Sequence, residues 1–328
     1  MSTKLDWLIV GGGPQGFHLT VRLLNAGVNP ESIRILDPHA APLHRWQSYT
    51  GNAGMSHLRS PQVHNLGLEA LGLEDLAQSA EFQAAKSAWQ EPTGENEPDF
   101  IPPYERPSLA LFHEHSRALV ARHGLMRSWK QGFATSMQSA ETGYRISLRS
   151  GETLAPRNVV LALGSGDHLR WPAWATTLKS RHQEAPLDHI FDMCFHREHL
   201  DPSEDVVIVG AGISAAQLAL SLAKSGTKRR ITLLARHSLR QADFESDPGW
   251  LGPLYLAEFD AEQDLLKRRQ MIDEARQLGS LAADVMQDLT RALRAGEVTH
   301  TLAHVQRAAW NGAGTPIRMD IRRMELDE

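Results

Sequence analysis

Two short glycine-rich segments carry the residue types that hold a phosphate group. The first, GGGPQG at residues 11–16, follows the apolar run LIV, and the second, GAGISA at residues 210–215, follows VVIV. In such a turn the first glycine permits a tight bend, the second lets the backbone approach a pyrophosphate, and the third lets helix and strand pack closely. The N–H groups and partial positive charge at the start of the next helix attract the anion. Two such segments predict two bound dinucleotides.

An acidic residue accompanies the first turn at the spacing that a ribose requires. Asp37 ends the apolar run at residues 32–36, about 20 residues after the glycines, as the motif requires. A carboxylate there can accept both ribose hydroxyls and would repel a 2′-phosphate, which favours FAD or NAD over NADP. A Rossmann fold with a vacant site is the alternative. The residues predicted to bind this nucleotide are Gly11, Gly13, Pro14, Gln15, Gly16 and Asp37.

Basic residues replace the acid after the second turn. The strand expected at residues 231–235 ends in Arg236-His237, and Arg240 follows. A guanidinium in this place neutralises a 2′-phosphate, so the second nucleotide is predicted to be NADPH, with Arg236 as the leading contact. A solvated rim of arginines is the alternative. The residues predicted to bind NADPH are Gly210, Gly212, Ile213, Ser214, Arg236 and Arg240.

The elements that position these residues follow from the apolar pattern. We expect a strand over 5–10, a helix over 14–26 and a strand over 32–36, then a second strand–helix–strand unit with its helix over 214–224. A helix is expected near residue 108, a β-meander over 135–162 that ends at Gly164, and helices over 258–278 and 280–295.

These elements predict an α/β fold with two Rossmann-like dinucleotide-binding domains, a FAD domain with an inserted NADPH domain. The expected domains are 1–166 for FAD and 203–296 for NADPH, joined by a crossover over 167–202. Residues 297–328 are assigned to neither domain, and their return to the FAD domain is left open.

Composition excludes several classes of protein. The 328 residues carry a net charge of −5, which gives no electrostatic case for nucleic acid. The single cysteine, Cys194, rules out a disulfide framework and a redox-active cysteine pair.

His113 and His115 lack a third ligand at helical spacing, so no metal site is expected. Without an apolar run of membrane length or room for a signal peptide, the expected location is the cytoplasm. Composition does not decide the oligomeric state.

Further motifs give the sequence a family resemblance. The chain is similar to the class B flavoprotein monooxygenases and most resembles their lysine and ornithine N-hydroxylase branch. Beside the two glycine turns, the matching residues are the Arg45-Trp46 pair, MSHLRSP at 55–61, the proline-rich stretch 102–107, LALG at 161–164, and His189 before Phe191-Asp192.

The resemblance implies an FAD- and NADPH-dependent monooxygenase that N-hydroxylates a primary amine through a flavin C4a-hydroperoxide, with molecular oxygen as co-substrate. It places residues 55–60 along the flavin ring, with His57 hydrogen-bonding near it. It also places His189 where relatives meet the nicotinamide nucleotide, although Ile190 stands where a family signature often has serine. Arg45, Trp46, Arg59 and Gly164 join the expected cofactor-binding set.

One departure from the family pattern keeps two alternatives open. Relatives carry a C-terminal strand with a Thr-Gly pair that returns to the flavin domain, and residues 317–328 hold no such pair. The departure predicts a shortened chain or an open flavin pocket. An open pocket favours an NADPH-dependent flavin reductase or oxidase without oxygen insertion. The other alternative is a catalytically silent nucleotide-binding regulatory protein.

Overall fold

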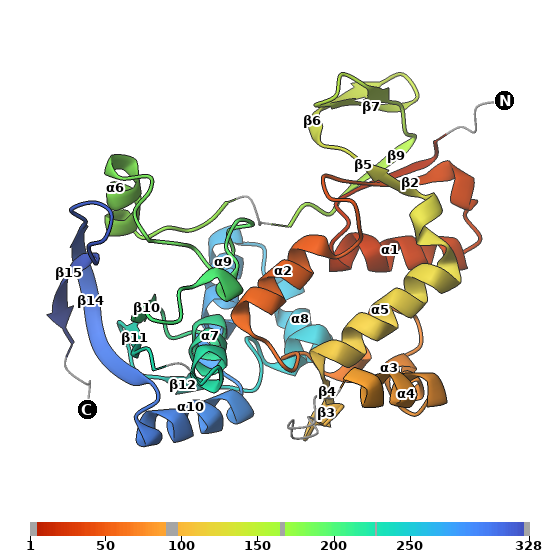
Figure 1. The fold of residues 1–328 in the computed structure, drawn as a ribbon. Helices are drawn as coiled ribbons and strands as arrows, with labels where there is room; N and C mark the ends of the chain where they lie inside the picture. The colour runs from red at the N-terminus through yellow and green to blue at the C-terminus, as the bar shows by residue number, and fades with distance from the viewer. Residues whose placement is uncertain (1–4, 90–97, 165–167, 227, 325–328) are drawn as a thin grey trace. The chain divides into compact units, whose positions relative to one another are not determined.

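The computed structural model describes residues 5–89, 98–164, 168–226 and 228–324, and its contacts divide the chain into two units. The first unit is Met1–Thr50 with Ser56–Leu169, and the second is Gly51–Met55 with Arg170–Glu328 (Figure 1). The strip Gly51–Met55 therefore groups with the second unit, and so does the C-terminal segment 297–328.

A four-stranded parallel sheet is the centre of the first unit. Its order is β5-β2-β1-β9. Leu8 and Ile9 are fully buried because helices of the unit and the neighbouring strands surround an apolar central strand. Helix α1 (Pro14–Asn25) connects β1 to β2 and ends before Gly27, whose φ of +84° suits glycine. The strands are β1 (Trp7–Val10), β2 (Ile33–Asp37), β5 (Trp129–Gln131) and β9 (Asn158–Leu161).

Helices and a separate meander complete the first unit. Ser108 begins α5 (Leu109–His123) by accepting a hydrogen bond from the Leu111 N–H, and Gly124 ends it with a left-handed φ of +57°. Strands β6 (Ala134–Ala140), β7 (Gly143–Leu148) and β8 (Thr153–Leu154) form a three-stranded antiparallel sheet, seen as a projecting meander in Figure 1. The remaining elements are η1 (Pro30–Ser32), α2 (His44–Ala53), η2 (Gln62–His64), α3 (Gly72–Ala77), α4 (Ala80–Trp89), β3 (Phe100–Ile101), β4 (Arg106–Pro107) and η3 (Leu125–Arg127).

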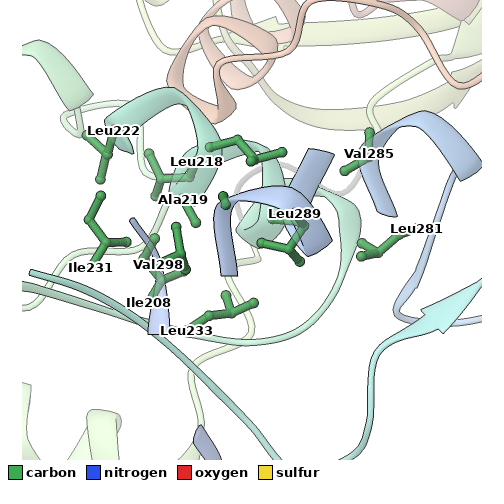
Figure 2. Packing of buried hydrophobic residues seen from close by; sticks show 13 residues of the cluster. Ile208, Leu218, Ala219, Leu222, Ile231, Leu233, Leu281, Val285, Leu289 and Val298 are labelled. Atoms are coloured by element: carbon green, nitrogen blue, oxygen red, sulfur yellow. The ribbon is translucent and has the colours of Figure 1, made fainter. Parts of the chain in front are cut away.

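The second unit has its own four-stranded sheet, in the order β10-β11-β14-β15. The first three strands are parallel and β15 is antiparallel to β14. Aliphatic residues of helices α7 (Ile213–Lys224) and α10 (Ala283–Ala295) pack with residues of the sheet, as Figure 2 shows for Leu218, Leu233 and Leu289. The strands are β10 (Val206–Val209), β11 (Ile231–Ala235), β14 (Thr299–Ala309) and β15 (Arg318–Arg323).

The connection from β11 to α10 differs from the sequence expectation. The single helix expected over 258–278 is two helices, because Asp264 accepts hydrogen bonds from the N–H groups of Leu266 and Lys267 and starts a new helix. The elements here are β12 (Arg240–Gln241), η5 (Pro248–Leu251), α8 (Pro253–Ala261), α9 (Leu265–Ala275) and β13 (Ser280–Leu281), while α6 (Ala173–Arg181) and η4 (Arg197–His199) precede β10.

The strip Gly51–Met55 is bound within the second unit by a specific contact. The side-chain amide of Asn52 donates to the backbone carbonyl of Phe195 at 2.6 Å, and both residues are buried. Helix α2 therefore begins in one unit and ends in the other.

Candidate nucleotide-binding sites

The first glycine turn has two closed positions and one open one. Gly11 has a φ of +112°, and a Cβ there would stand 2.2 Å from the carbonyl oxygen of Ala162. A Cβ on Gly16 would stand 2.0 Å from the carbonyl oxygen of Gly11. A Cβ on Gly13 would meet nothing within 4 Å. Gly11 and Gly16 are therefore needed by the fold, whereas Gly13 borders open space of the kind that a pyrophosphate occupies.

Helix α1 presents its amino end at this open space. Gly13 is the N-cap residue and makes no side-chain cap, and Pro14 occupies the first helical position. Gln15 is exposed beside them. The carbonyl of Gly13 already accepts from the Phe17 N–H, so the helix starts at the turn itself. Uncapped N–H groups and the helix dipole make this end attractive to an anion.

Asp37 lies against the first turn, as the sequence predicts, but its carboxylate is already engaged. Its Oδ2 accepts the backbone N–H of Gly12 at 2.7 Å. Its Oδ1 accepts the backbone N–H of His39 at 2.9 Å and stands 2.8 Å from the His39 Nδ1. Three of roughly four acceptor positions of the carboxylate are therefore used within the protein.

Three residues that the sequence analysis did not predict, Trp129, His39 and His44, complete this corner. The ring of Trp129 closes over Gly12, where a Cβ would stand 2.1 Å from its Cη2, and its indole N–H donates to the His39 carbonyl at 3.1 Å. His39 stacks on His44 with ring centroids 4.5 Å apart. Burial is the main reason that the pKa of His44 is lowered, and the charge of His39 adds to it. No local pattern marks Trp129, since it reaches the site through the pairing of β5 with β2.

The residues expected along the flavin occupy α2 and the loop after it. Trp46 packs on Phe112 with ring centroids 4.9 Å apart and meets His113 edge-on at 5.6 Å. Arg45 and Arg59 are both partly exposed. Their contact with a cofactor stays a prediction.

His57 is a buried residue with both ring nitrogens engaged. Its Nε2 lies 2.7 Å from the carbonyl oxygen of Pro98, which can only accept, so Nε2 carries the proton. Its Nδ1 lies 3.2 Å from the Ser56 hydroxyl. This arrangement anchors the loop, and a role at the flavin stays a prediction.

The end of β9 lies beside the first turn. The Ala162 N–H donates to the Val10 carbonyl, and the Ala162 carbonyl stands against Gly11. Gly164 follows with a left-handed φ of +63°, and a Cβ there would meet nothing within 4 Å. Leu161 and Leu163 are 56% and 58% exposed.

The second glycine turn repeats the design of the first. Gly210 has a φ of +144°, and its N–H donates to the Leu234 carbonyl. Gly212 is the N-cap of α7 and has no side-chain cap, and Ile213 and Ser214 begin the helix. Burial of aliphatic side chains of α7 holds this helix end at the carboxyl edge of the sheet.

Two of the predicted arginines stand beyond the end of β11. Arg236 and Arg240 are exposed, and Arg240 pairs with Ser280 where β12 and β13 run side by side. Arg230, by contrast, is held by Asp205 at the far end of β11, with its Nε 2.8 Å from Oδ2. The contact of Arg236 and Arg240 with a nucleotide stays a prediction.

His189 lies in the second unit among aromatic rings. Trp171 meets it edge-on at 5.2 Å, and its Nδ1 accepts the Phe191 N–H at 3.2 Å. Burial lowers the pKa of His189, against the smaller opposing effect of Asp192. The ring is therefore neutral near pH 7, with its proton on Nε2.

Among the described residues, no helix combines the length and apolarity needed to cross a membrane. The same residues hold no group of three or more His, Cys, Asp and Glu side chains suited to a metal ion.

The fold and the paired glycine turns define the class of dinucleotide-binding flavoprotein folds, and comparison with family models identifies the family. Residues 8–166 match the FAD-NAD(P)-binding model. Residues 132–304 match the L-lysine 6-monooxygenase/L-ornithine 5-monooxygenase model. The chain belongs to the L-lysine 6-monooxygenase/L-ornithine 5-monooxygenase family, which confirms the resemblance and the α/β fold class inferred from the sequence.

Solved structures share the fold across nearly the whole chain. The ornithine hydroxylase PvdA from Pseudomonas aeruginosa has a TM-score of 0.70 at 17% identity, over 98% of this chain and 78% of that one. The ornithine N-hydroxylase KtzI from Kutzneria sp. 744 has a TM-score of 0.70 at 16% identity, over 98% and 76%. The cadaverine monooxygenase DfoA from Erwinia amylovora has a TM-score of 0.67 at 15% identity, over 98% and 76%. Comparison with the curated proteins gave no match.

Proposed function

We propose that the protein is an FAD- and NADPH-dependent monooxygenase that hydroxylates the nitrogen of a primary amine. The observation that carries the proposal is the first turn, where Gly11 and Gly16 are closed by their neighbours and Gly13 alone borders open space beside an uncapped helix. Family membership supplies the reaction class. PvdA and KtzI are named for ornithine and DfoA for cadaverine, which supports an amine as substrate.

The residues present fit a flavin dinucleotide at the first turn. Gly13 would admit its pyrophosphate at the turn that Gly11 and Gly16 shape, and the N–H groups at the start of α1 would bind the anion. Asp37 would accept a ribose hydroxyl. Arg45, Trp46 and Arg59 would face the remainder of the cofactor. A bound flavin accepts hydride and activates oxygen. The protein's part is to hold the dinucleotide, desolvate the amine and exclude water.

The residues of the second turn fit a phosphorylated nicotinamide dinucleotide. Gly210, Gly212 and the start of α7 would hold its pyrophosphate, and Arg236 and Arg240 would neutralise the 2′-phosphate. His189 is neutral and would offer an Nε2–H to the nucleotide. A dependence on NADPH is also our reason to propose a cytoplasmic location.

A spectroscopic titration tests this function. The purified protein should absorb near the wavelengths of oxidised flavin, should bleach when NADPH is added without oxygen, and should recover in air. NADH should bleach it more slowly. Retention of oxidised flavin under anaerobic NADPH contradicts the proposal.

A second candidate is an NADPH oxidase that releases hydrogen peroxide. The observation that favours it is the exposure of Leu161 and Leu163 on either side of Ala162, which stands against the first turn. Apolar exposure at that place is consistent with a flavin site that admits water. Stoichiometry separates the two functions. Formation of hydroxylamine from lysine, ornithine or a diamine identifies the monooxygenase, whereas one peroxide for each NADPH, unchanged by any amine, identifies the oxidase.

A further inference from the structure

A segment far along the chain forms a wall of the second glycine turn. A Cβ on Gly212 would stand 3.7 Å from the Cα of Gly279, so the two glycines are immediate neighbours. Gly279 has a left-handed φ of +74° and precedes β13, which pairs with β12. The sequence motif does not include Gly279, and the pairing of β12 with β13 brings it to the turn.

The imidazole of His237 also lies against Gly279. A Cβ on Gly279 would stand 3.4 Å from Cε1 and 3.5 Å from Nε2 of that ring. His237 directly follows Arg236 at the end of β11, and its ring is partly exposed. Gly212, Gly279 and His237 thus form a continuous surface, beginning at the pyrophosphate turn and ending at the carboxyl end of the second strand. In a dinucleotide fold, the 2′ position of the ribose lies at this strand end.

One hydrogen bond fixes the ring of His237. Nδ1 lies 2.9 Å from the carbonyl oxygen of Ser238, which can only accept, so Nδ1 holds the proton of the neutral ring. Nε2 then carries the lone pair. In the doubly protonated ring, Nε2 is a second N–H donor and the imidazole carries a positive charge.

His300 on β14 does not supply this charge. Burial is the main cause that lowers the pKa of His300, and the nearby charge of His237 lowers it further. His300 is therefore neutral near pH 7 and brings no charge to a phosphate. Arg236 on the same strand end provides a permanent charge beside it.

We infer that His237, fixed by the Ser238 carbonyl and the Gly279 backbone, is a second contact for the 2′-phosphate of the nicotinamide nucleotide, beside Arg236. The inference rests on the proposed function for the identity of that nucleotide. It makes His237 a specificity residue that distinguishes NADPH from NADH.

Calorimetric binding of 2′,5′-ADP and 5′-AMP to the full chain tests the inference, because the two ligands differ only in the 2′-phosphate. His237→Ala should weaken binding of 2′,5′-ADP by about tenfold to a hundredfold, as for loss of one hydrogen bond to a charged group, and leave the affinity for 5′-AMP within about twofold. His237→Arg should restore the preference. The exposed His199→Ala is the matched control and should change neither affinity.

Two results would overturn the inference. One is an equal loss of affinity for both ligands in His237→Ala, which would show that the His237 ring has only a structural role. The other is an unchanged ratio of the two affinities. Gly279→Ala gives an independent readout, since the left-handed φ of +74° strains a residue with a Cβ. The backbone against which His237 lies should shift and lower the 2′,5′-ADP preference in a protein that circular dichroism shows to be folded. If 2′,5′-ADP binding depends on His237 but NADPH never reduces the flavin, the inference stands and the proposed function fails.

Discussion

The backbone N–H of Gly12 donates to Oδ2 of Asp37 at 2.7 Å, which joins the first glycine turn to the acidic residue at the end of β2. The contact fixes one carboxylate oxygen at the turn, while His39 holds the other. Asp37 is thus both a candidate ligand residue and a structural one. Replacing it should change cofactor affinity and the shape of the turn together.

Asp37→Asn should lower the affinity of the apoprotein for FAD by about tenfold to a hundredfold, because a charged acceptor shared by the turn and the ribose is lost. Fluorescence titration of flavin-free protein measures the dissociation constant. Asp75→Asn, an exposed carboxylate on α3, is the control and should leave it unchanged. An affinity preserved in Asp37→Asn would move the ribose contact elsewhere.

Gly13→Ala should lower the affinity for FAD without lowering stability, whereas Gly16→Ala should lower the stability of the fold. The first adds a methyl group into open space at a φ of −73°, so the thermal midpoint should hold while FAD binding falls at least tenfold. The second drives a Cβ to 2.0 Å from the Gly11 carbonyl oxygen and should lower the free energy of unfolding by about 1–3 kcal/mol or more. Thermal melts and flavin titration distinguish them. Normal FAD binding by a stable Gly13→Ala protein would contradict the assignment of this site.

Arg236→Ala should reduce the preference for NADPH over NADH by about tenfold or more, because the 2′-phosphate loses a charge-assisted partner. The ratio of the two anaerobic flavin-reduction rates measures it. Arg230→Ala is the matched control, since Asp205 already holds that guanidinium. If Arg230→Ala, and not Arg236→Ala, lowers the ratio of the two reduction rates, the phosphate lies at the other end of the strand.

Acid should destabilise the protein through its buried histidines. Burial lowers the pKa of His115 below that of the unfolded chain, although Glu69 partly opposes it. The unfolded chain therefore binds the proton first, so stability is complete above the unfolded value near 6.5 and decreases as the pH falls below it. The loss reaches at most about 1.4 kcal/mol per pH unit for each such group. Burial also lowers the pKa values of His113, His189 and His300, so these residues add to the loss of stability in acid.

Urea unfolding at pH 7.5 and 5.5 measures this loss. The fall in the free energy of unfolding should be smaller in His115→Gln, which cannot titrate, than in the wild type. His199→Gln, at an exposed position, should behave as the wild type does. Equal losses in all three proteins would assign the acid sensitivity to other groups.

The sequence pattern predicts the two nucleotide-binding cores well and the rest less well. The strand expected over 231–235 is observed as Ile231–Ala235, because an apolar run bounded by polar residues has few other places to lie. Residues 299–309 carried no strand signal, yet they form β14 by pairing with β11 on one side and β15 on the other. Helix α2 was missed for a related reason, since HRWQSYTGNA has little apolar periodicity.

The residues of the candidate sites likewise include some that the sequence predicts and others that it does not. The glycines and Asp37 are recognisable because their spacing along the chain is fixed by one strand, one turn and one helix. Trp129, Gly279 and the His39–His44 pair reach the turns through strand pairing or ring stacking, and no local pattern reports such contacts. The break at Asp264 was readable, since an aspartate before an apolar pair is a helix start.

The membership of Gly51–Met55 in the second unit limits how the protein can be dissected. A gene fragment that encodes 170–328 alone would omit Asn52 and leave the carbonyl of buried Phe195 without that donor. The complementary fragment, 1–169, would carry Asn52 without the Phe195 carbonyl to which it donates. Separate expression of the halves should therefore yield poorly folded material, and co-expression of both pieces is the arrangement in which the missing strip can be supplied in trans.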